Sequence, residues 1–466
     1  MSEKNGAIYN ARELGTGKTL VLGLQHLFAM FGATVLVPII TGLSVSATLL
    51  FAGIATLFCH LVTGGKVPVF LGSSFAFLGG YAAIAPTQLA DGSPNPELSR
   101  LLPYACVGVA CAGLLYLVLA LICKAVGSHR VMKFFPPVVT GPIIIAIGLN
   151  LAPSAINNCD DNWWLALVAI VVVIVCNIWG KGMIKIIPIL LGVIASYVVA
   201  AISGNVDFSG VADAAWIGLP VNWGRTVFGL FGSGEVNGGL VASAIITIMP
   251  IAVATMMEHV GDISAIGGTV GKNFIEDPGL HRTLIGDGVG TAIAALFGAP
   301  ANTTYGENTG VLALTKVYDP FVIRIAALYA IILSFCPKFS AVIEAMPAAT
   351  IGGVSLILYG MISAIGIRNM VENHTDFQKS RNVIIAALII GLSIGINFSG
   401  ALGANITPEG GNAATGAITF VIGDVTVALS GLAVASIIGI VINAILPGKN
   451  ETFYQNPKDA GSLGKY

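Results

Sequence analysis

Charged residues are scarce in this chain. Asp, Glu, Lys and Arg make up only 10% of its 466 residues, whereas soluble domains use roughly 25%. Apolar residues reach 55%, with a mean hydropathy of +0.88, and a soluble domain has too small a core to bury that much apolar surface. A net charge of −1 argues against a nucleic-acid partner. The chain is therefore predicted to be a multi-pass membrane protein, surrounded by the lipid bilayer.

Signals of several other protein classes are missing. The seven cysteines lie mostly in apolar runs without CxxC spacing, so we expect inert packing thiols. We find no cluster of metal ligands and no nucleophile paired with a base, and we expect neither an enzyme nor a cofactor. Gly15 to Thr19 imitates a phosphate-binding loop, but Arg12 stands where that motif needs glycine. The first 18 residues are polar, and we expect no cleavable signal peptide.

Long apolar runs fill most of the chain. A helix needs about 20 apolar residues to cross a membrane, which predicts about 14 spans. They are expected to start near Thr19, Ser46, Val69, Leu101, Phe134, Trp163 and Ile184, and near Leu240, Arg282, Ala301, Phe321, Met346, Asn382 and Thr426. The third and the tenth are short and interrupted. Interrupted spans at matching places in two halves indicate a transporter built from repeats.

The spacing of polar and aromatic residues supports two repeats. Phe75 and Glu307 are 232 residues apart (307 − 75), as are His26 and Glu258 (258 − 26), against a half-length of 233. A long segment, 204–238, divides the chain near its middle. Seven spans in each half would give the two repeats opposite orientations in the membrane.

Positive charge predicts the orientation, because Lys and Arg accumulate in short cytoplasmic loops. One side receives Lys66, Lys124, Arg130, Lys133, Lys181, Lys185, Lys272, Lys316, Arg368, Lys379 and Arg381. The other side keeps Arg100, Arg225 and Lys338. Both termini are therefore expected in the cytoplasm.

The stretch 299–316 gathers polar side chains at the expected depth of the membrane. It reads APANTTYGENTGVLALTK and contains Glu307 between Gly306 and Gly310. An ionisable group in hydrocarbon faces a cavity or a partner, and irregular backbone is tolerated there only around such a cavity. A carboxylate beside accessible amides offers the acceptor and donor that a planar ring of alternating carbonyl and N–H groups requires. The stretch predicts a broken span around a small-molecule site, with a buried structural glutamate as the alternative.

A pair of carboxylates marks the eighth span. Glu258 and Asp262 are four residues apart and so share one helix face. Two close carboxylates oppose each other's ionisation, which suits reversible proton uptake. For Asp262 the alternative is a solvated or capping position at the cytoplasmic helix end, because Gly267 and Gly268 follow it.

Three further residues have two interpretations each. Phe75 lies beside Gly72, Ser73 and Ser74 and suits stacking on a flat heterocycle, although Phe in a span more often packs. His26 in the first span is a satisfied core residue or part of a proton path, and the structural role is favoured. Asp287, in LIGDGVG, is equally suited to structural bonding and to proton handling.

These residues lie in motifs that resemble the nucleobase/ascorbate transporter family over nearly the whole chain, and the bacterial uracil permeases in particular. The matching stretches are LQHLFAMFGATVLVP at Leu24 to Pro38, LGSSFAF at Leu71 to Phe77, EHVGD at Glu258 to Asp262, DPGLHR at Asp277 to Arg282, and NTTYGENTGVLALTK at Asn302 to Lys316. The last contains the family signature, namely Glu307, Asn308, Gly310, Thr315 and Lys316.

The resemblance implies an all-α membrane fold of fourteen spans in two inverted repeats of seven. Short antiparallel strands would break spans three and ten. It also implies a core domain (19–127 and 239–342), a gate domain (128–203 and 343–446), cytoplasmic ends (1–18 and 447–466) and an extracellular segment (204–238). A homodimer through the gate is expected.

The resemblance assigns residues to a nucleobase site. Glu258 and Glu307 would hydrogen-bond the base, Phe75 and Gly306 would supply backbone contacts, and Tyr305 and Ala33 would line the site. Glu at position 307 favours uracil, because purine-transporting relatives tend to carry Gln there. Asp262 and Asp287 depart from the uracil permease pattern of His and Asn and favour xanthine or a broader range of bases.

The main hypothesis is a symporter that imports uracil with a proton. The candidate proton-coupling residues are Glu258, Asp262, Asp287 and His26. A passive channel needs a continuous polar pore, and the scarcity of charge in most spans argues against one. No metal is expected in the site.

Overall fold

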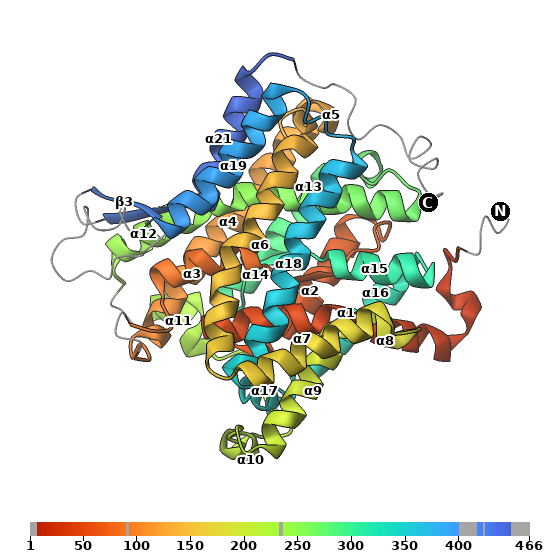
Figure 1. Cartoon of the computed structure of the whole chain (residues 1–466), viewed down its shortest axis with the longest axis vertical. Coiled ribbons are helices and arrows are strands. Elements are labelled where there is room, and N and C mark those ends of the chain that lie inside the picture. The colour runs from red at the N-terminus through yellow and green to blue at the C-terminus, as the bar shows by residue number, and fades with distance from the viewer. Residues whose placement is uncertain (1–6, 90–92, 233–235, 400–416, 423–424, 449–466) are drawn as a thin grey trace.

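The computed structural model describes residues 7–89, 93–232, 236–399, 417–422 and 425–448. Most of these residues are helical (Figure 1). A helix satisfies its backbone N–H and C=O groups within its own segment, which is the condition for crossing hydrocarbon. The apolar runs of the sequence therefore fold as predicted, into an all-α membrane architecture with small strands only.

The first half contains α1 (Thr16–Thr41), α2 (Val45–Val62), β1 (Leu71–Ser73), α3 (Leu78–Ile84), α4 (Leu98–Val126), α5 (Ser128–Met132), α6 (Pro137–Asp160), α7 (Trp163–Ile178), α8 (Met183–Ile186) and α9 (Pro188–Ile202). Between the halves lie α10 (Ser209–Asp213) and α11 (Val227–Gly232). The second half contains α12 (Gly238–Ile248), α13 (Ala252–Val270), α14 (Leu280–Leu296), β2 (Asn302–Thr304), α15 (Gly306–Thr315), α16 (Pro320–Ser334), α17 (Pro337–Glu344), α18 (Ala348–Glu372), α19 (Ser380–Phe398), β3 (Ala417–Ile422), β4 (Val425–Ser430) and α21 (Gly431–Ile445). Short 3₁₀ or π turns occupy Ala11–Leu14, Phe75–Phe77, Trp223–Arg225, Met249–Ile251 and Ile275–Gly279.

The helices differ widely in length. Within the described residues, seven helical segments are long and apolar enough to span a membrane, with α12 and α13 counted as one. The pair α16 and α17 is bent by 88° and adds an eighth if it is one span. Helices α7, α9 and α21 are apolar but shorter. The count of fourteen spans therefore stays a prediction.

Two paired strands interrupt the third and tenth predicted spans, as expected. Strand β1 follows Pro68 and strand β2 follows Pro300, and proline lacks the N–H that a helix interior requires. The strands pair antiparallel, with Leu71 opposite Thr304 and Ser73 opposite Asn302. Each strand therefore satisfies the backbone polar groups of the other inside the protein.

Helix packing reveals the internal repeat. In the first half α7 packs on α9, and in the second half α19 packs on α21. The contact between α2 and α16 corresponds to the contact between α14 and α4. In the same way, the contact between α6 and α19 corresponds to the contact between α18 and α7. Each pair is reproduced when every element is exchanged for its equivalent in the other half. The predicted repeat of the same elements in the two halves is confirmed, and their opposite orientation stays a prediction.

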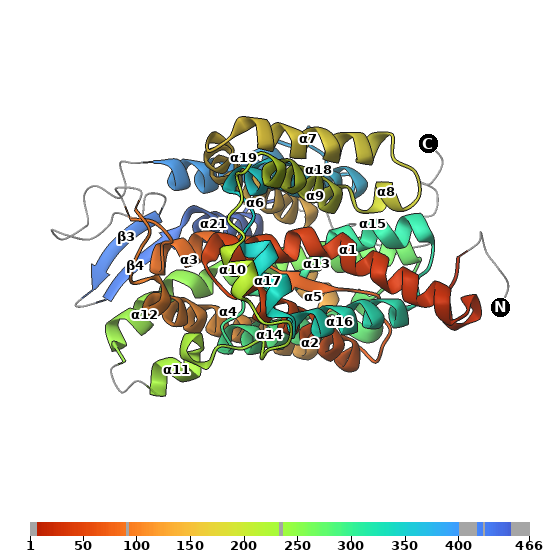
Figure 2. The same ribbon diagram turned by 90° about the horizontal axis from the view of Figure 1, so that it is seen from below.

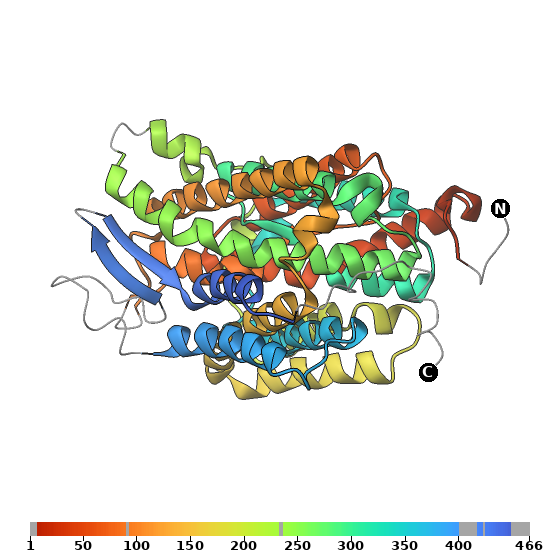
Figure 3. The same ribbon diagram turned by 90° about the horizontal axis from the view of Figure 1, so that it is seen from above.

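The helices form two layers. Figure 2 shows α6, α7, α9, α18 and α19 together on one side, with α2, α4, α14 and α16 on the other. Figure 3, from the opposite direction, shows the same separation. Helix α13 touches α6 in one layer and α4 in the other, and α1 touches α9 and α16. The assignment of the layers to a gate and a core domain remains a prediction.

The region before the last helix differs from the prediction. A span was expected to start near Thr426, but β3 and β4 pair as an antiparallel hairpin and α21 begins only at Gly431. The sequence AITFVI and VTVALS is rich in β-branched residues, which favour strands over helices. The predicted cytoplasmic tail lies outside the described residues from position 449 onward.

Candidate functional site

Strands β1 and β2 lie between four helices. Strand β1 contacts α1 and α2, and β2 contacts the corresponding helices α13 and α14. The pairing continues beyond the strands, because Ser74 N donates to Ala301 O at 2.8 Å and Tyr305 N donates to Phe70 O at 3.1 Å. Directly after each strand a helical segment begins, at Phe75 and at Gly306. Two helix N-termini therefore start beside the paired strands.

Tyr305 fastens the two strands to α1. Its hydroxyl donates to Ser73 O at 2.9 Å and lies 3.3 Å from Thr34 Oγ1. Ser73 Oγ donates in turn to Thr34 O at 2.8 Å and lies 3.4 Å from the carbonyl oxygen of Ala33. A Cβ at Gly72 would lie 2.5 Å from the Tyr305 ring, so only glycine fits there. The side chain of Tyr305 and the backbone carbonyl of Ala33 thus lie where the strands meet α1.

The three carboxylates nearest the strands come from α13 and α15. Glu258 interacts electrostatically with Asp262, Glu307 and Asp287. Glu307 lies in the first turn of α15 and accepts a hydrogen bond from its own amide. Negative charge is stabilised at a helix N-terminus by the helix dipole and the free amides. The structure therefore brings together Glu258, Asp262 and Glu307, which are up to 49 residues apart in sequence (307 − 258).

Asp262 is not a solvated residue at a helix end. Only 7% of its surface is exposed, and α13 continues to Val270 through Gly267 and Gly268. Its Oδ2 accepts a hydrogen bond from Thr304 Oγ1 at 2.8 Å. The alternative interpretation of this residue is therefore wrong, because the two glycines do not end the helix. Asp262 instead ties α13 to strand β2.

Backbone amides complete the arrangement. Phe75 and Gly306 are the first residues of their helical segments, and an amide at that position has no acceptor within its own helix. The Phe75 ring is buried and meets the ring of Tyr359 on α18 edge-on, with centroids 5.6 Å apart. Donors, acceptors and an aromatic face therefore occur together around the paired strands.

His26 connects α1 to α15. Asn308 Nδ2 donates to the carbonyl oxygen of His26 at 3.2 Å and lies 3.2 Å from His26 Nδ1. Both side chains are buried. His26 Nδ1 therefore has a partner, but Nε2 is buried and has no hydrogen-bond partner among the described residues, so the ring is not fully satisfied. Its part in proton transfer stays a prediction.

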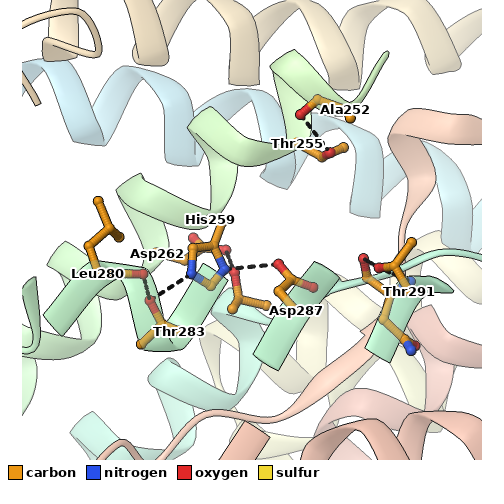
Figure 4. A network of polar contacts seen from close by, with 10 residues as sticks. Ala252, Thr255, His259, Asp262, Leu280, Thr283, Asp287 and Thr291 are labelled. Carbon is orange, nitrogen blue, oxygen red and sulfur yellow. Dashed lines mark hydrogen bonds and ion pairs between the residues drawn. The ribbon is translucent and has the colours of Figure 1, made fainter. Parts of the chain in front are cut away.

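Asp287 joins a second polar network, shown in Figure 4. Its Oδ2 lies 2.9 Å from His259 Nδ1, and the other ring nitrogen of His259 lies 3.0 Å from Thr283 Oγ1. Thr283 and Asp287 are four residues apart on α14 and so present one face to α13. His259 was overlooked in the sequence, where it follows Glu258 and reads as part of the same motif. The four-residue spacing of Thr283 and Asp287 is the sequence signal that indicates a shared polar face on this helix.

Comparison with known proteins assigns the family. The family model described as "Permease family" matches residues 17–402. The chain is 38% identical to the uracil permease of Bacillus caldolyticus over 456 residues, which cover 95% of this chain and 96% of that protein. The chain belongs to the nucleobase/ascorbate transporter family of permeases. This permease is also 37% identical to the uracil permease of Bacillus subtilis (strain 168), over 92% of both chains.

The fold is shared with a more distant membrane protein. The transmembrane domain of the cyanobacterial bicarbonate transporter BicA superposes on this permease with a TM-score of 0.54, at 15% identity. The match covers 94% of this chain and 99% of the other. At that identity the likeness concerns the fold alone. It supports the architecture of the permease described above.

Proposed function

We propose that this permease is a proton-coupled symporter that imports a nucleobase, with uracil as the substrate, across the cytoplasmic membrane. The observation that carries the proposal concerns Glu258 and Glu307, two half-buried carboxylates. Glu258 lies on α13, which contacts β2, and Glu307 lies on α15, which begins directly after β2. Uracil permeases among the relatives support the choice of substrate. We propose no enzymatic step and no cofactor.

The proposed contacts follow from the chemistry of the uracil ring, which alternates N–H and C=O groups around one edge. Glu258 and Glu307 would accept hydrogen bonds from the ring N–H groups. The amides of Phe75 and Gly306, which have no acceptor within their own helices, would donate to the ring carbonyls. Stacking of an aromatic face adds affinity, and Phe75 provides that face. Tyr305 and Ala33 would line the rest of the site.

Glu258 is the proposed coupling residue. It interacts with three other carboxylates, so the first proton to reach the cluster relieves the most repulsion there. A protonated Glu258 removes one charge from the moving part of the protein, and moving charge through hydrocarbon is costly. Asp262, Asp287 and His26 are the other candidates. The proton is the only coupling ion proposed.

The proposed movement slides a core domain against a gate domain. The core would comprise residues 19–127 and 239–342, and the gate residues 128–203 and 343–446. Small residues mark the contact, since a Cβ at Gly32 would lie 2.5 Å from Ile189 Cγ2 on α9. Smooth helix faces allow backbones to approach and slide. We further propose a homodimer formed through the gate, with both termini in the cytoplasm.

Labelled uracil uptake into proteoliposomes tests the proposal. We expect an inward proton gradient to drive accumulation, and Glu258→Gln to keep exchange of internal for external uracil while losing accumulation. Accumulation by this variant at the wild-type level would refute the role of Glu258. Uptake that no gradient accelerates would indicate a passive pathway instead.

Two observations favour a second substrate class. Asp262 and Asp287 are carboxylates where the uracil permease pattern has His and Asn, and both lie near Glu258. Xanthine, or purines and pyrimidines together, is therefore the alternative. Unlabelled xanthine added in excess distinguishes the two: uracil uptake that persists supports a uracil permease, and uptake that is abolished widens the substrate class.

A further inference from the structure

His259 has a defined protonation partner at each ring nitrogen. Thr283 Oγ1 lies 3.0 Å from both Leu280 O and His259 Nε2. Its single hydrogen can point to only one of them, and when it points to Leu280 O the hydroxyl accepts from Nε2. In that arrangement Nε2 carries a hydrogen. On the other side, Nδ1 lies 2.9 Å from Asp287 Oδ2, a distance at which two acceptors without a hydrogen between them would repel each other. Figure 4 shows the ring between these two partners.

With a hydrogen on Nε2, two arrangements remain for the pair. In one, His259 is an imidazolium and Asp287 a carboxylate. In the other, His259 is neutral and Asp287 is a carboxylic acid that donates to Nδ1. Both arrangements hold the same number of protons and have no net charge.

The surroundings of His259 and Asp287 oppose any change in the number of protons that the pair holds. Both side chains are 0% exposed. A Cβ at Gly288 would lie 2.4 Å from Tyr116 Cβ, and one at Gly286 would lie 2.9 Å from Cys59 Cα, so α14 is wedged between α2 and α4. The titratable groups that face Asp287 are Cys59 on α2, Tyr116 on α4, and Glu258, His259 and Asp262 on α13. A net charge on the pair would therefore be buried without water to solvate it.

We propose that His259 and Asp287 form an electroneutral pair that keeps its shared proton throughout the transport cycle. His259 is then a positioning residue rather than a proton carrier. It directly follows Glu258, and fixing its ring to α14 fixes the rotation of α13 about its own axis. That rotation directs Glu258 and Asp262 toward strand β2. The inference rests on the proposed symport and narrows its coupling group to the residues next to the strands.

Three variants test the pair by uptake in proteoliposomes. In His259→Gln, Asp287 loses its partner, and we expect uptake to fall by about tenfold or more, the usual consequence of an unpaired buried charge. Its uptake should recover toward acidic pH, where Asp287 takes up a proton. Asp287→Asn should keep gradient-driven accumulation, because the amide Nδ2 can donate to Nδ1 of a neutral ring that carries its hydrogen on Nε2. The double variant should regain most of the uptake that His259→Gln loses.

The outcomes separate this proposal from others. If Asp287→Asn loses accumulation but keeps exchange, Asp287 carries the transported proton and the proposal is overturned. If the double variant is no better than His259→Gln, charge balance is not the role of His259. A purely steric role predicts neither the rescue nor the acidic shift of the pH profile.

A measurement on the wild-type protein tests the protonation of the pair directly. Nitrogen NMR of ¹⁵N-histidine-labelled permease, with His259→Gln for assignment, should show His259 signals unchanged between about pH 5 and pH 9, where an ordinary histidine titrates. A signal that titrates in this range overturns the proposal. If a proton gradient does not change wild-type uptake, the proposed symport is refuted. The spectrum still decides whether the His259–Asp287 pair keeps its proton.

Discussion

The two interrupted spans have the same backbone and different chemistry. Each has a three-residue strand followed by a helical segment, and the strands pair with each other. In the first half, the aromatic residue Phe75 follows the strand. In the second half, Glu307 follows the strand, 232 residues later (307 − 75). The carboxylates near the strands, Glu258, Asp262, Asp287 and Glu307, all belong to the second half. Symmetry thus provides the scaffold, and the departure from symmetry provides the polar chemistry.

This division has a physical reason. Four carboxylates supplied by both halves would face one another across the paired strands, and each buried charge needs its own partner. With all of them in one half, Asp262 has Thr304, Asp287 has His259, and Glu307 has the start of α15. The other half is free to present neutral and aromatic groups. The predictions below separate the two contributions, from the largest expected effect to the smallest.

Glu307→Ala tests the contribution of the carboxylates in the second half. Removing the charged acceptor should weaken uracil binding by about 10- to 100-fold, the range for hydrogen bonds to charged groups. Equilibrium binding of labelled uracil to the purified permease measures the change. Glu344→Ala, on α17, is the control and should bind as the wild type does. Unchanged affinity in Glu307→Ala would remove this residue from the site.

The shared scaffold is tested by Gly72→Ala. The added Cβ would lie 2.5 Å from the Tyr305 ring and 2.8 Å from Thr34 Oγ1. Overpacking of this kind costs about 1–3 kcal/mol of stability, so the melting temperature in detergent should fall. Gly79→Ala is the matched control, since a Cβ there meets nothing within 4 Å. Equal melting temperatures for the two variants would show that the Tyr305 ring can move aside at little cost in stability.

The aromatic side is tested by Phe75→Leu. Leucine keeps an apolar side chain and loses the flat face, so uracil affinity should fall by about fivefold, the value of one aromatic contact. The backbone amide of residue 75 is retained, which separates stacking from the proposed amide contact. Binding to the purified protein gives the ratio. An affinity equal to that of the wild type would mean that Phe75 only packs against Tyr359.

The smallest effect is expected for Thr304→Val. Valine has nearly the same shape but removes the donor to Asp262, so uptake should fall by about threefold, the net value of one hydrogen bond. The neighbouring Thr303 offers a close control, because its hydroxyl has no hydrogen-bond partner among the described residues. Thr303→Val should transport normally. A loss in both variants would point to the strand itself rather than to Asp262.

The sequence predicts the parts of this site that depend on local signals. Polar residues and prolines inside apolar runs locate the broken spans, because each is costly in hydrocarbon unless it has a polar partner or lines a cavity. The same reasoning identifies Glu258 and Glu307 before any contact is known. It also gives the two repeats, through matching separations along the chain.

Contacts between distant segments could not be predicted in the same way. The anchor of Thr34, Ser73 and Tyr305 joins three segments, and no spacing in the sequence reveals it. His259 pairs with Asp287 because of the rotation of α13 relative to α14, which periodicity alone does not determine. At Gly267 and Gly268 a local signal was misleading, since packing carries the helix on to Val270. Strand β4 was read as the start of the last span because its composition is apolar.

The pairing of β1 with β2 also constrains how the protein is made. A ribosome completes Leu71–Ser73 long before it reaches Asn302–Thr304, the segment that satisfies the first strand's backbone. Until then, polar backbone groups in the third span have no partner, and hydrocarbon does not tolerate them exposed. The first half must therefore wait, near water or within the insertion machinery, for the second half to arrive. Assembly of the site is consequently a late event, completed only when both halves of the chain are in the membrane.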